Sequence, residues 1–98
     1  MPETEKAAQF RLADDVVFRV VDGEAVILSI GSGLYFGLTP VGTRIWELME
    51  TGKRLDEILG ALVAEYDAPE ADVKRDLDEL VSKLVSRGLV APVPVDAR

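Results

Sequence analysis

The chain has 98 residues, which is enough for one domain with a single core and too few for two ordinary domains. Hydrophobic residues make up 48% and charged residues 30%, a balance typical of a folded chain rather than a disordered one. The formal net charge of −7 repels phosphate backbones and anionic lipid, so neither nucleic acid nor a membrane is expected as a partner.

Two residue types that dominate enzyme sites, Cys and His, are absent from the sequence. Their absence excludes disulfides, thiolate catalysis, Cys-ligated metal centres and the usual imidazole base. We therefore expect a binding protein rather than an enzyme, with no catalytic residue, no metal and no cofactor. No apolar run reaches the roughly 18 residues of a membrane span, and the N-terminus does not resemble a signal peptide. A cytoplasmic location is the resulting expectation.

Both ends of the chain are predicted to be flexible tails. Residues 1–15 are polar without a sustained period, and residues 91–98 contain Pro92 and Pro94. The ordered domain is therefore expected over residues 16–90. Its first half is rich in β-branched and aromatic residues and its second half shows helical spacing, which indicates an α+β fold.

A β-hairpin is predicted around Asp22-Gly23, a dipeptide that favours two-residue turns. The strands on either side are residues 16–21 and 24–30, and both of their faces carry apolar side chains. Either a bulge shifts the register or the outer face of the sheet is partly covered. The predicted register pairs Phe18 with Ile27 and Arg19 with Val26.

A third strand and three helices are predicted to follow. Residues 34–38 form the strand, and Thr39-Pro40 starts the first helix as a cap and a first helical residue. Gly52 and Gly88 end the first and third helices, and a proline-containing break ends the second. The predicted architecture is a three-stranded antiparallel sheet followed by three helices, which is similar to a winged helix-turn-helix.

The third helix does not suit DNA or a metal ion. Seven acidic and two basic residues lie between Glu65 and Leu80, whereas a groove-reading helix needs the opposite sign. Asp72, Asp76 and Glu79 have the spacing of three carboxylates on one side of a helix. Because acidic residues near a helix N-terminus are stabilised by the macrodipole, we interpret them as structural.

The predicted third strand is the candidate binding element. It would lie at the edge of the sheet, yet it lacks the lysine, proline or inward charge that usually blunts an edge. Either another part of the chain covers this edge, or it stays open for an extended peptide that adds as a further strand. The candidate peptide-binding residues are Leu34, Tyr35, Phe36, Gly37 and Leu38 from the strand and Val73, Lys74, Arg75 and Leu77 from the third helix.

An ordered set of short motifs runs through the third strand and all three helices. The motifs are Gly33-Leu34-Tyr35-Phe36-Gly37-Leu38-Thr39-Pro40-Val41-Gly42, Ile45-Trp46-Glu47-Leu48, Gly52, Asp56-Glu57-Ile58, Leu62, Tyr66, Asp76-Leu77, Leu80, Leu84 and Gly88-Leu89-Val90. Over about residues 16–90 the chain resembles the PqqD-like family, whose members are peptide-binding domains known as RiPP recognition elements. The Tyr-Phe-Gly-Leu strand and the Val-Gly-x-x-Ile-Trp helix are more similar to standalone members from lasso-peptide clusters than to the pyrroloquinoline quinone member.

The resemblance implies both a function and a set of partners. Family members bind the leader of a ribosomally made precursor peptide as an extra strand beside the third strand and against the third helix. They present the leader to a modifying enzyme, which could be a leader peptidase, a macrocyclase or a radical SAM enzyme. They have no catalytic residues of their own. The alternative hypothesis is a homodimer or assembly subunit in which the same edge pairs with a second copy.

Overall fold

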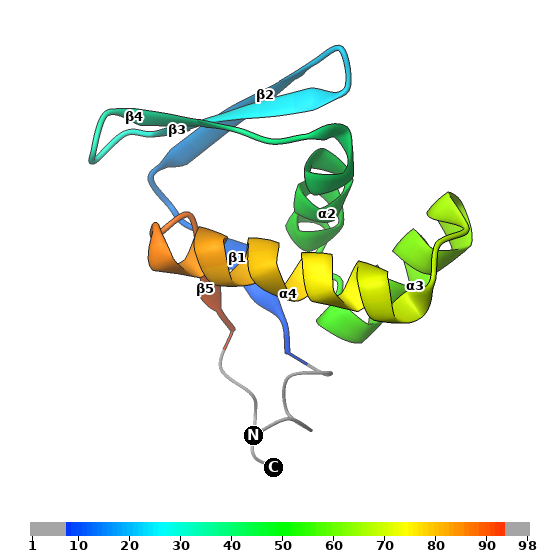
Figure 1. The fold of residues 1–98 in the computed structure, drawn as a ribbon. Coiled ribbons are helices and arrows are strands. Elements are labelled where there is room, and N and C mark those ends of the chain that lie inside the picture. Colours follow the sequence, from blue (N-terminus) through cyan, green and yellow to red (C-terminus); the bar gives the residue numbers. More distant parts are fainter. Residues whose placement is uncertain (1–7, 94–98) are drawn as a thin grey trace.

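The structure is a computed structural model, and it describes residues 8–93. It confirms the predicted α+β fold, with an antiparallel three-stranded sheet followed by three helices (Figure 1). The elements in chain order are β1 (Phe10–Leu12), β2 (Val16–Val21), β3 (Glu24–Ser29), β4 (Leu34–Gly37), α2 (Pro40–Glu50), α3 (Leu55–Tyr66), α4 (Glu70–Ser86) and β5 (Val90–Pro92).

The β2–β3 hairpin has the predicted register, with Phe18 opposite Ile27. Asp22 and Gly23 form the turn with φ angles of 53° and 80°. Two successive positive φ angles are typical of the turn that joins twisted strands through two residues. The hairpin therefore follows from local sequence alone.

The sheet has one buried and one exposed face. Ala25 and Ile27 on β3 are fully buried against the helices. On the opposite face Val17 is 51% exposed and Tyr35 is 70% exposed. The pairing of β2 with β3 is continuous, so no bulge shifts the register, and nothing within residues 8–93 buries the outer face. Both of the alternatives that the sequence left open are therefore wrong for the described part of the chain.

The helix ends follow the predicted signals. The Gly42 N–H donates to the Thr39 hydroxyl at 3.1 Å, and Pro40 occupies the first turn of α2. Gly52, directly after α2, has a φ of 88°, which a side chain would disfavour. None of the helices within residues 8–93 is both long enough and apolar enough to cross a membrane.

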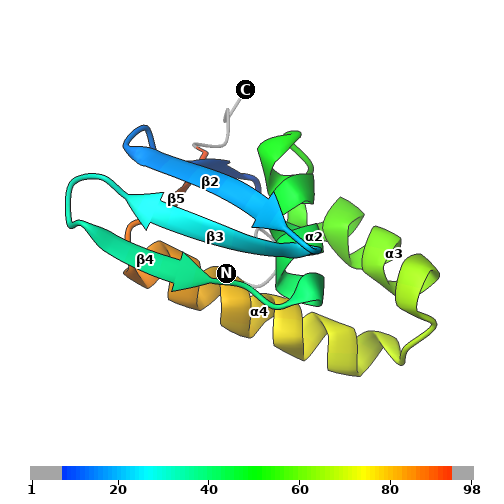
Figure 2. The same cartoon turned by 90° about the horizontal axis from the view of Figure 1, so that it is seen from above.

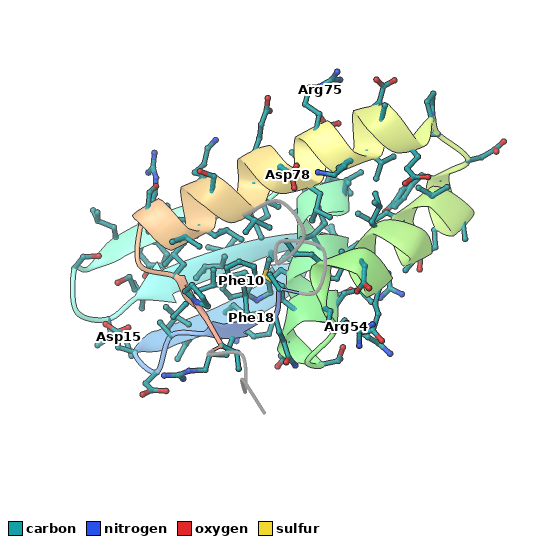
Figure 3. All side chains as sticks on the ribbon, turned by 90° about the horizontal axis from the view of Figure 1, so that it is seen from below. Phe10, Asp15, Phe18, Arg54, Arg75 and Asp78 are labelled. Carbon is teal, nitrogen blue, oxygen red and sulfur yellow. The ribbon has the colours of Figure 1, made fainter. Side chains whose placement is uncertain are left out.

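The core lies between the sheet and the three helices. Trp46 of α2 is fully buried and packs edge to face on Phe18, with ring centroids 5.6 Å apart. Phe10 and Phe18 both point into the centre of the molecule (Figure 3). The buried cluster consists of Ile27, Ile45, Trp46, Leu48, Met49, Leu55, Ile58, Leu62, Leu77, Val81, Leu84, Leu89 and Val90.

The predicted tails are wrong for two short segments, which form a second sheet. β1 pairs antiparallel with β5, so that Leu12 lies opposite Val90 and Phe10 opposite Pro92. The Val93 N–H also donates to the Gln9 carbonyl at 2.7 Å. Each of these strands has only three residues, so neither segment shows a regular hydrophobic period in the sequence. The ordered domain thus extends beyond residues 16–90, and residues 1–7 and 94–98 of the predicted tails lie outside the described residues.

Candidate functional site

β4 forms one edge of the three-stranded sheet. The strand order is β2-β3-β4, and no strand within residues 8–93 pairs with the outer edge of β4. Figure 2 shows this edge lying alongside α4. The strand from Leu34 to Gly37 carries no charge, and an unprotected, uncharged edge can accept a further strand.

The hydrogen-bond pattern identifies the backbone groups that face outward. The Leu38 N–H donates to the Ala25 carbonyl at 2.9 Å, so this opposed pair is of the hydrogen-bonded type. Because such pairs alternate along an antiparallel ladder, Phe36 also directs its N–H and carbonyl toward β3. Tyr35 and Gly37 direct theirs away from the sheet. The free edge thus offers two donors and two acceptors to an added strand.

A pocket of about 540 Å³ opens at the end of this edge. It lies between the end of β4, the start of α2 and one side of α4, and we call it the edge pocket. Its residues are Gly37, Leu38, Thr39, Val41, Gly42, Ile45, Asp76, Glu79, Leu80 and Lys83. Aliphatic side chains form much of its surface, and α4 contributes two carboxylates and one ammonium group.

Two glycines, Gly37 and Gly42, line the edge pocket, and an added side chain would have different surroundings at each. A Cβ at Gly37 would meet no atom within 4 Å, so the space beside the end of β4 is empty. A Cβ at Gly42 would lie 3.3 Å from the Thr39 hydroxyl oxygen and 3.5 Å from a Leu80 methyl group. The 3.5 Å separation from Leu80 is an ordinary van der Waals distance, so the start of α2 and α4 are in contact at Gly42.

Arg87 follows α4 and lies next to the middle of β4. Its guanidinium carbon is 5.4 Å from the centre of the Phe36 ring, within the range of a cation–π contact. Leu34, at the start of the strand, is 56% exposed. The edge of β4 is therefore flanked by an apolar and aromatic surface with one cation beside it.

The five predicted strand residues all lie on or directly beside this edge, but the predicted helix residues do not line the edge pocket. Leu77 is 2% exposed and belongs to the core, and Val73 packs partly buried against the core. Lys74 is paired with Asp78 at 2.8 Å. Arg75 points away from the body of the molecule (Figure 3).

The helix residues that do line the pocket were missed by sequence reasoning. Asp76, Glu79, Leu80 and Lys83 stand at i, i+3, i+4 and i+7, so they share one side of α4. That side adjoins the apolar stripe that packs on the core. The spacing had already grouped Asp76 and Glu79 on one side of the helix, but only the placement of β4 shows that this side of α4 borders the open edge.

No group of three or more His, Cys, Asp or Glu side chains within residues 8–93 could hold a metal ion. The carboxylates of α4 are instead placed among basic neighbours on the same helix. Arg75 lies 3.5 Å from Asp72 and 3.8 Å from Asp76. The site is therefore described by its backbone edge and its apolar pocket.

The comparisons with known proteins agree with this architecture. The family model described as coenzyme PQQ synthesis protein D (PqqD) matches residues 24–90, which is more than half of the chain. The chain belongs to the PqqD family. The resemblance predicted from the motifs is thus confirmed. Among curated proteins, none matches this PqqD family member.

Two solved structures are similar to this PqqD family member over most of its length. TbiB1 in complex with the TbiA(beta) leader peptide is 41% identical, with a TM-score of 0.80, and the match covers 88% of this chain and 99% of that one. A lasso peptide synthetase B1 complexed with the leader peptide is 28% identical, with a TM-score of 0.79, covering 87% and 100%. The predicted similarity to the lasso-peptide members of the family is confirmed as well.

Proposed function

We propose that this PqqD family member binds the leader segment of a ribosomally synthesised precursor peptide as an added strand on the outer edge of β4. The observation that carries the proposal is the uncharged edge itself, which pairs with no strand in the described part of the chain and borders the edge pocket. The two similar structures, each solved with a leader peptide, support the assignment of a leader as the guest.

The energetics require the pocket as well as the edge. Four backbone hydrogen bonds to Tyr35 and Gly37 contribute a net of roughly 0.5–1.5 kcal/mol each. Association costs roughly 4–15 kcal/mol in lost freedom of motion, so these bonds alone do not hold a peptide. An apolar guest side chain in the edge pocket supplies further free energy by removing its surface from water. We therefore expect a guest that combines strand-forming backbone with at least one apolar side chain.

Delivery of the bound leader to an enzyme is the second part of the proposal. A chain without Cys or His has neither a thiol nucleophile nor an imidazole base, and a leader held along an edge leaves its other side open to a second protein. The enzyme would be a leader peptidase, a macrocyclase or a radical SAM enzyme acting in the cytoplasm. No cofactor is needed for this role.

Binding of a fluorescently labelled TbiA(beta) leader peptide tests the proposal. We expect saturable binding to the wild-type protein and binding about tenfold or more weaker for Gly37→Pro, which removes an outward donor and leaves a guest carbonyl unpaired. Proline is tolerated on a free edge, and a Cβ at Gly37 would meet no atom within 4 Å.

The matched control is Val20→Pro on the opposite edge of the sheet. The Ile30 N–H donates to the Asp15 carbonyl at 2.8 Å, and alternation from that pair directs the Val20 N–H away from β3. This variant carries the same change on the wrong edge and should bind like the wild type. Equal binding by the wild type and Gly37→Pro, or no saturable binding of either known leader, would overturn the proposal. If sedimentation shows that the wild-type protein is a dimer and Gly37→Pro is a monomer, the alternative homodimer that pairs through the β4 edge is favoured instead.

A further inference from the structure

The side of α4 that borders β4 carries carboxylates in the middle of the helix and cations toward its C-terminal end. Asp76 and Glu79 lie in the edge pocket, near the end of β4 and the start of α2, and Lys83 lines the same pocket one turn later. Arg87 lies beside Phe36, farther back along the strand. α4 therefore runs antiparallel to β4, as Figure 2 also shows. An added strand would meet carboxylates at one end of its path and a guanidinium group at the other.

Most of these charges have no ion-pair partner within residues 8–93. Glu79, Lys83 and Arg87 form no ion pair there, and Asp76 forms only a long one, with Arg75 at 3.8 Å. By contrast, the Lys74 and Asp78 pair, which lies away from the edge pocket, closes at 2.8 Å. The charged groups beside the edge are therefore available to a guest.

The spacing of these charges matches that of side chains on a short strand. Asp76 and Arg87 are about 16 Å apart along the axis of α4 at the rise of an α-helix. About five residues of extended chain span that distance, and alternate side chains of a strand point to the same face. Roughly three side chains of an added strand would therefore face α4, one near each end and one at the apolar part of the pocket around Leu80.

We propose that the edge selects a guest by charge order as well as by strand formation. The guest segment carries, at alternate positions, a basic side chain beside Asp76 and Glu79, an apolar side chain at Leu80, and an acidic side chain beside Arg87. This inference rests on the proposed function, because it describes the peptide that the β4 edge would bind. The opposite charge order would place like charges together and is disfavoured.

The expected selectivity is moderate because all of these groups contact solvent. Exposed ion pairs are individually weak, each changing affinity by at most about fivefold. Two correctly placed pairs therefore favour the matching charge order by up to about thirtyfold in affinity. That range is large enough to appear as a composition bias among many competing peptides.

Selection from a random display library of short peptides tests the inference without a known leader. We expect peptides selected on the full-length wild-type protein to be enriched in a basic, an apolar and an acidic residue at alternate positions. On Asp76→Asn with Glu79→Gln the enrichment of the basic residue should fall by up to about fivefold. On Arg87→Gln the enrichment of the acidic residue should fall instead, and Arg87→Lys should retain it.

Asp78→Asn is the matched control, since it neutralises a carboxylate of the same helix outside the edge pocket and should leave the selected sequences unchanged. Circular dichroism checks that each variant is folded. Selected peptides that lose affinity for Gly37→Pro but show no charge order would overturn this inference and leave the proposed function intact. Peptides that bind Gly37→Pro unchanged, or a library that yields no binder, would contradict the proposed function itself, and the inference with it.

Discussion

Neighbouring residues of β4 direct their backbone groups to opposite sides of the strand. Phe36 faces β3 and has its ring over the core side of the sheet, whereas Gly37 faces outward. A backbone donor that serves the native ladder and one that is free for the proposed guest strand are therefore adjacent in sequence. The hydrogen bond from the Leu38 N–H to the Ala25 carbonyl shows which residues of β4 face β3 and which face outward. The sequence alone does not reveal this choice.

Proline substitution should separate these two roles. Phe36→Pro removes an inward donor and an aromatic ring that packs on the core, so we expect loss of the native fold. Gly37→Pro removes an outward donor and should leave the circular dichroism spectrum and the cooperative thermal transition in place. Native-like melting of Phe36→Pro, or unfolding of Gly37→Pro, would show that the alternation is assigned the wrong way round.

Leu77 shows where sequence reasoning could not separate a groove from a core. Its place on an apolar helical stripe is compatible with either, and the structure buries it among core residues. We expect Leu77→Ala to lower the free energy of unfolding by roughly 2–5 kcal/mol, the usual cost of a core cavity. Urea denaturation measures this, and Arg75→Ala on the exposed side of the same helix should change it by less than about 0.5 kcal/mol.

At the scale of elements, most of the fold could be predicted because its signals are local. The Asp22-Gly23 turn, the Thr39-Pro40 start of α2 and the helical stripes of α3 and α4 each depend on residues close in sequence. The β1–β5 pairing joins residues about 80 positions apart through strands of three residues each, so no local period announces it. The edge pocket was missed for the same reason, because it forms where distant elements meet.

The β1 strand should contribute measurably to stability if it is an integral part of the domain. Phe10 packs against the core cluster, whereas Arg11 beside it is exposed. We expect Phe10→Ala to lower the free energy of unfolding by about 1–3 kcal/mol, less than for a fully buried ring. Arg11→Ala serves as the control, with an expected change below about 0.5 kcal/mol. Equal and negligible effects in denaturant titrations would mean that the segment behaves as a tail.

α2 and α3 are joined by an ion pair whose contribution should depend on pH. Arg44 hydrogen-bonds to Glu65 with its closest N–O distance at 2.8 Å, and this bond lowers the pKa of the Glu65 carboxyl below its ordinary value of 4.5. A lowered folded-state pKa stabilises the fold above the ordinary value, and the contribution is lost as the pH falls through the folded-state value.

Glu65→Gln should therefore lower the free energy of unfolding slightly at neutral pH. The difference from the wild type should disappear in acid, where the wild-type carboxyl is protonated as well. Denaturant titrations at neutral and acidic pH measure both values, and the effect is small because both side chains are partly exposed. A difference that persists unchanged in acid would show that the amide alters packing rather than charge.

At the scale of the whole molecule, composition and fold can be considered together. The sequence carries a net charge of −7, which repels the phosphate backbone of nucleic acid. The fold then places an uncharged strand at the edge of a small sheet, beside a pocket bordered by a charged helix. The uncharged outer edge of β4 and the pocket beside it are thus the features on which the proposed peptide binding rests.

Backbone amide hydrogen exchange in the presence and absence of the TbiA(beta) leader peptide tests strand addition most directly. The amides of Tyr35 and Gly37 point outward, so they should exchange quickly in the free protein and become protected when the peptide binds. The Phe36 amide, already bonded to β3, should change far less. Binding that leaves the Tyr35 and Gly37 amides unprotected would contradict the account, because the peptide would then occupy a different surface.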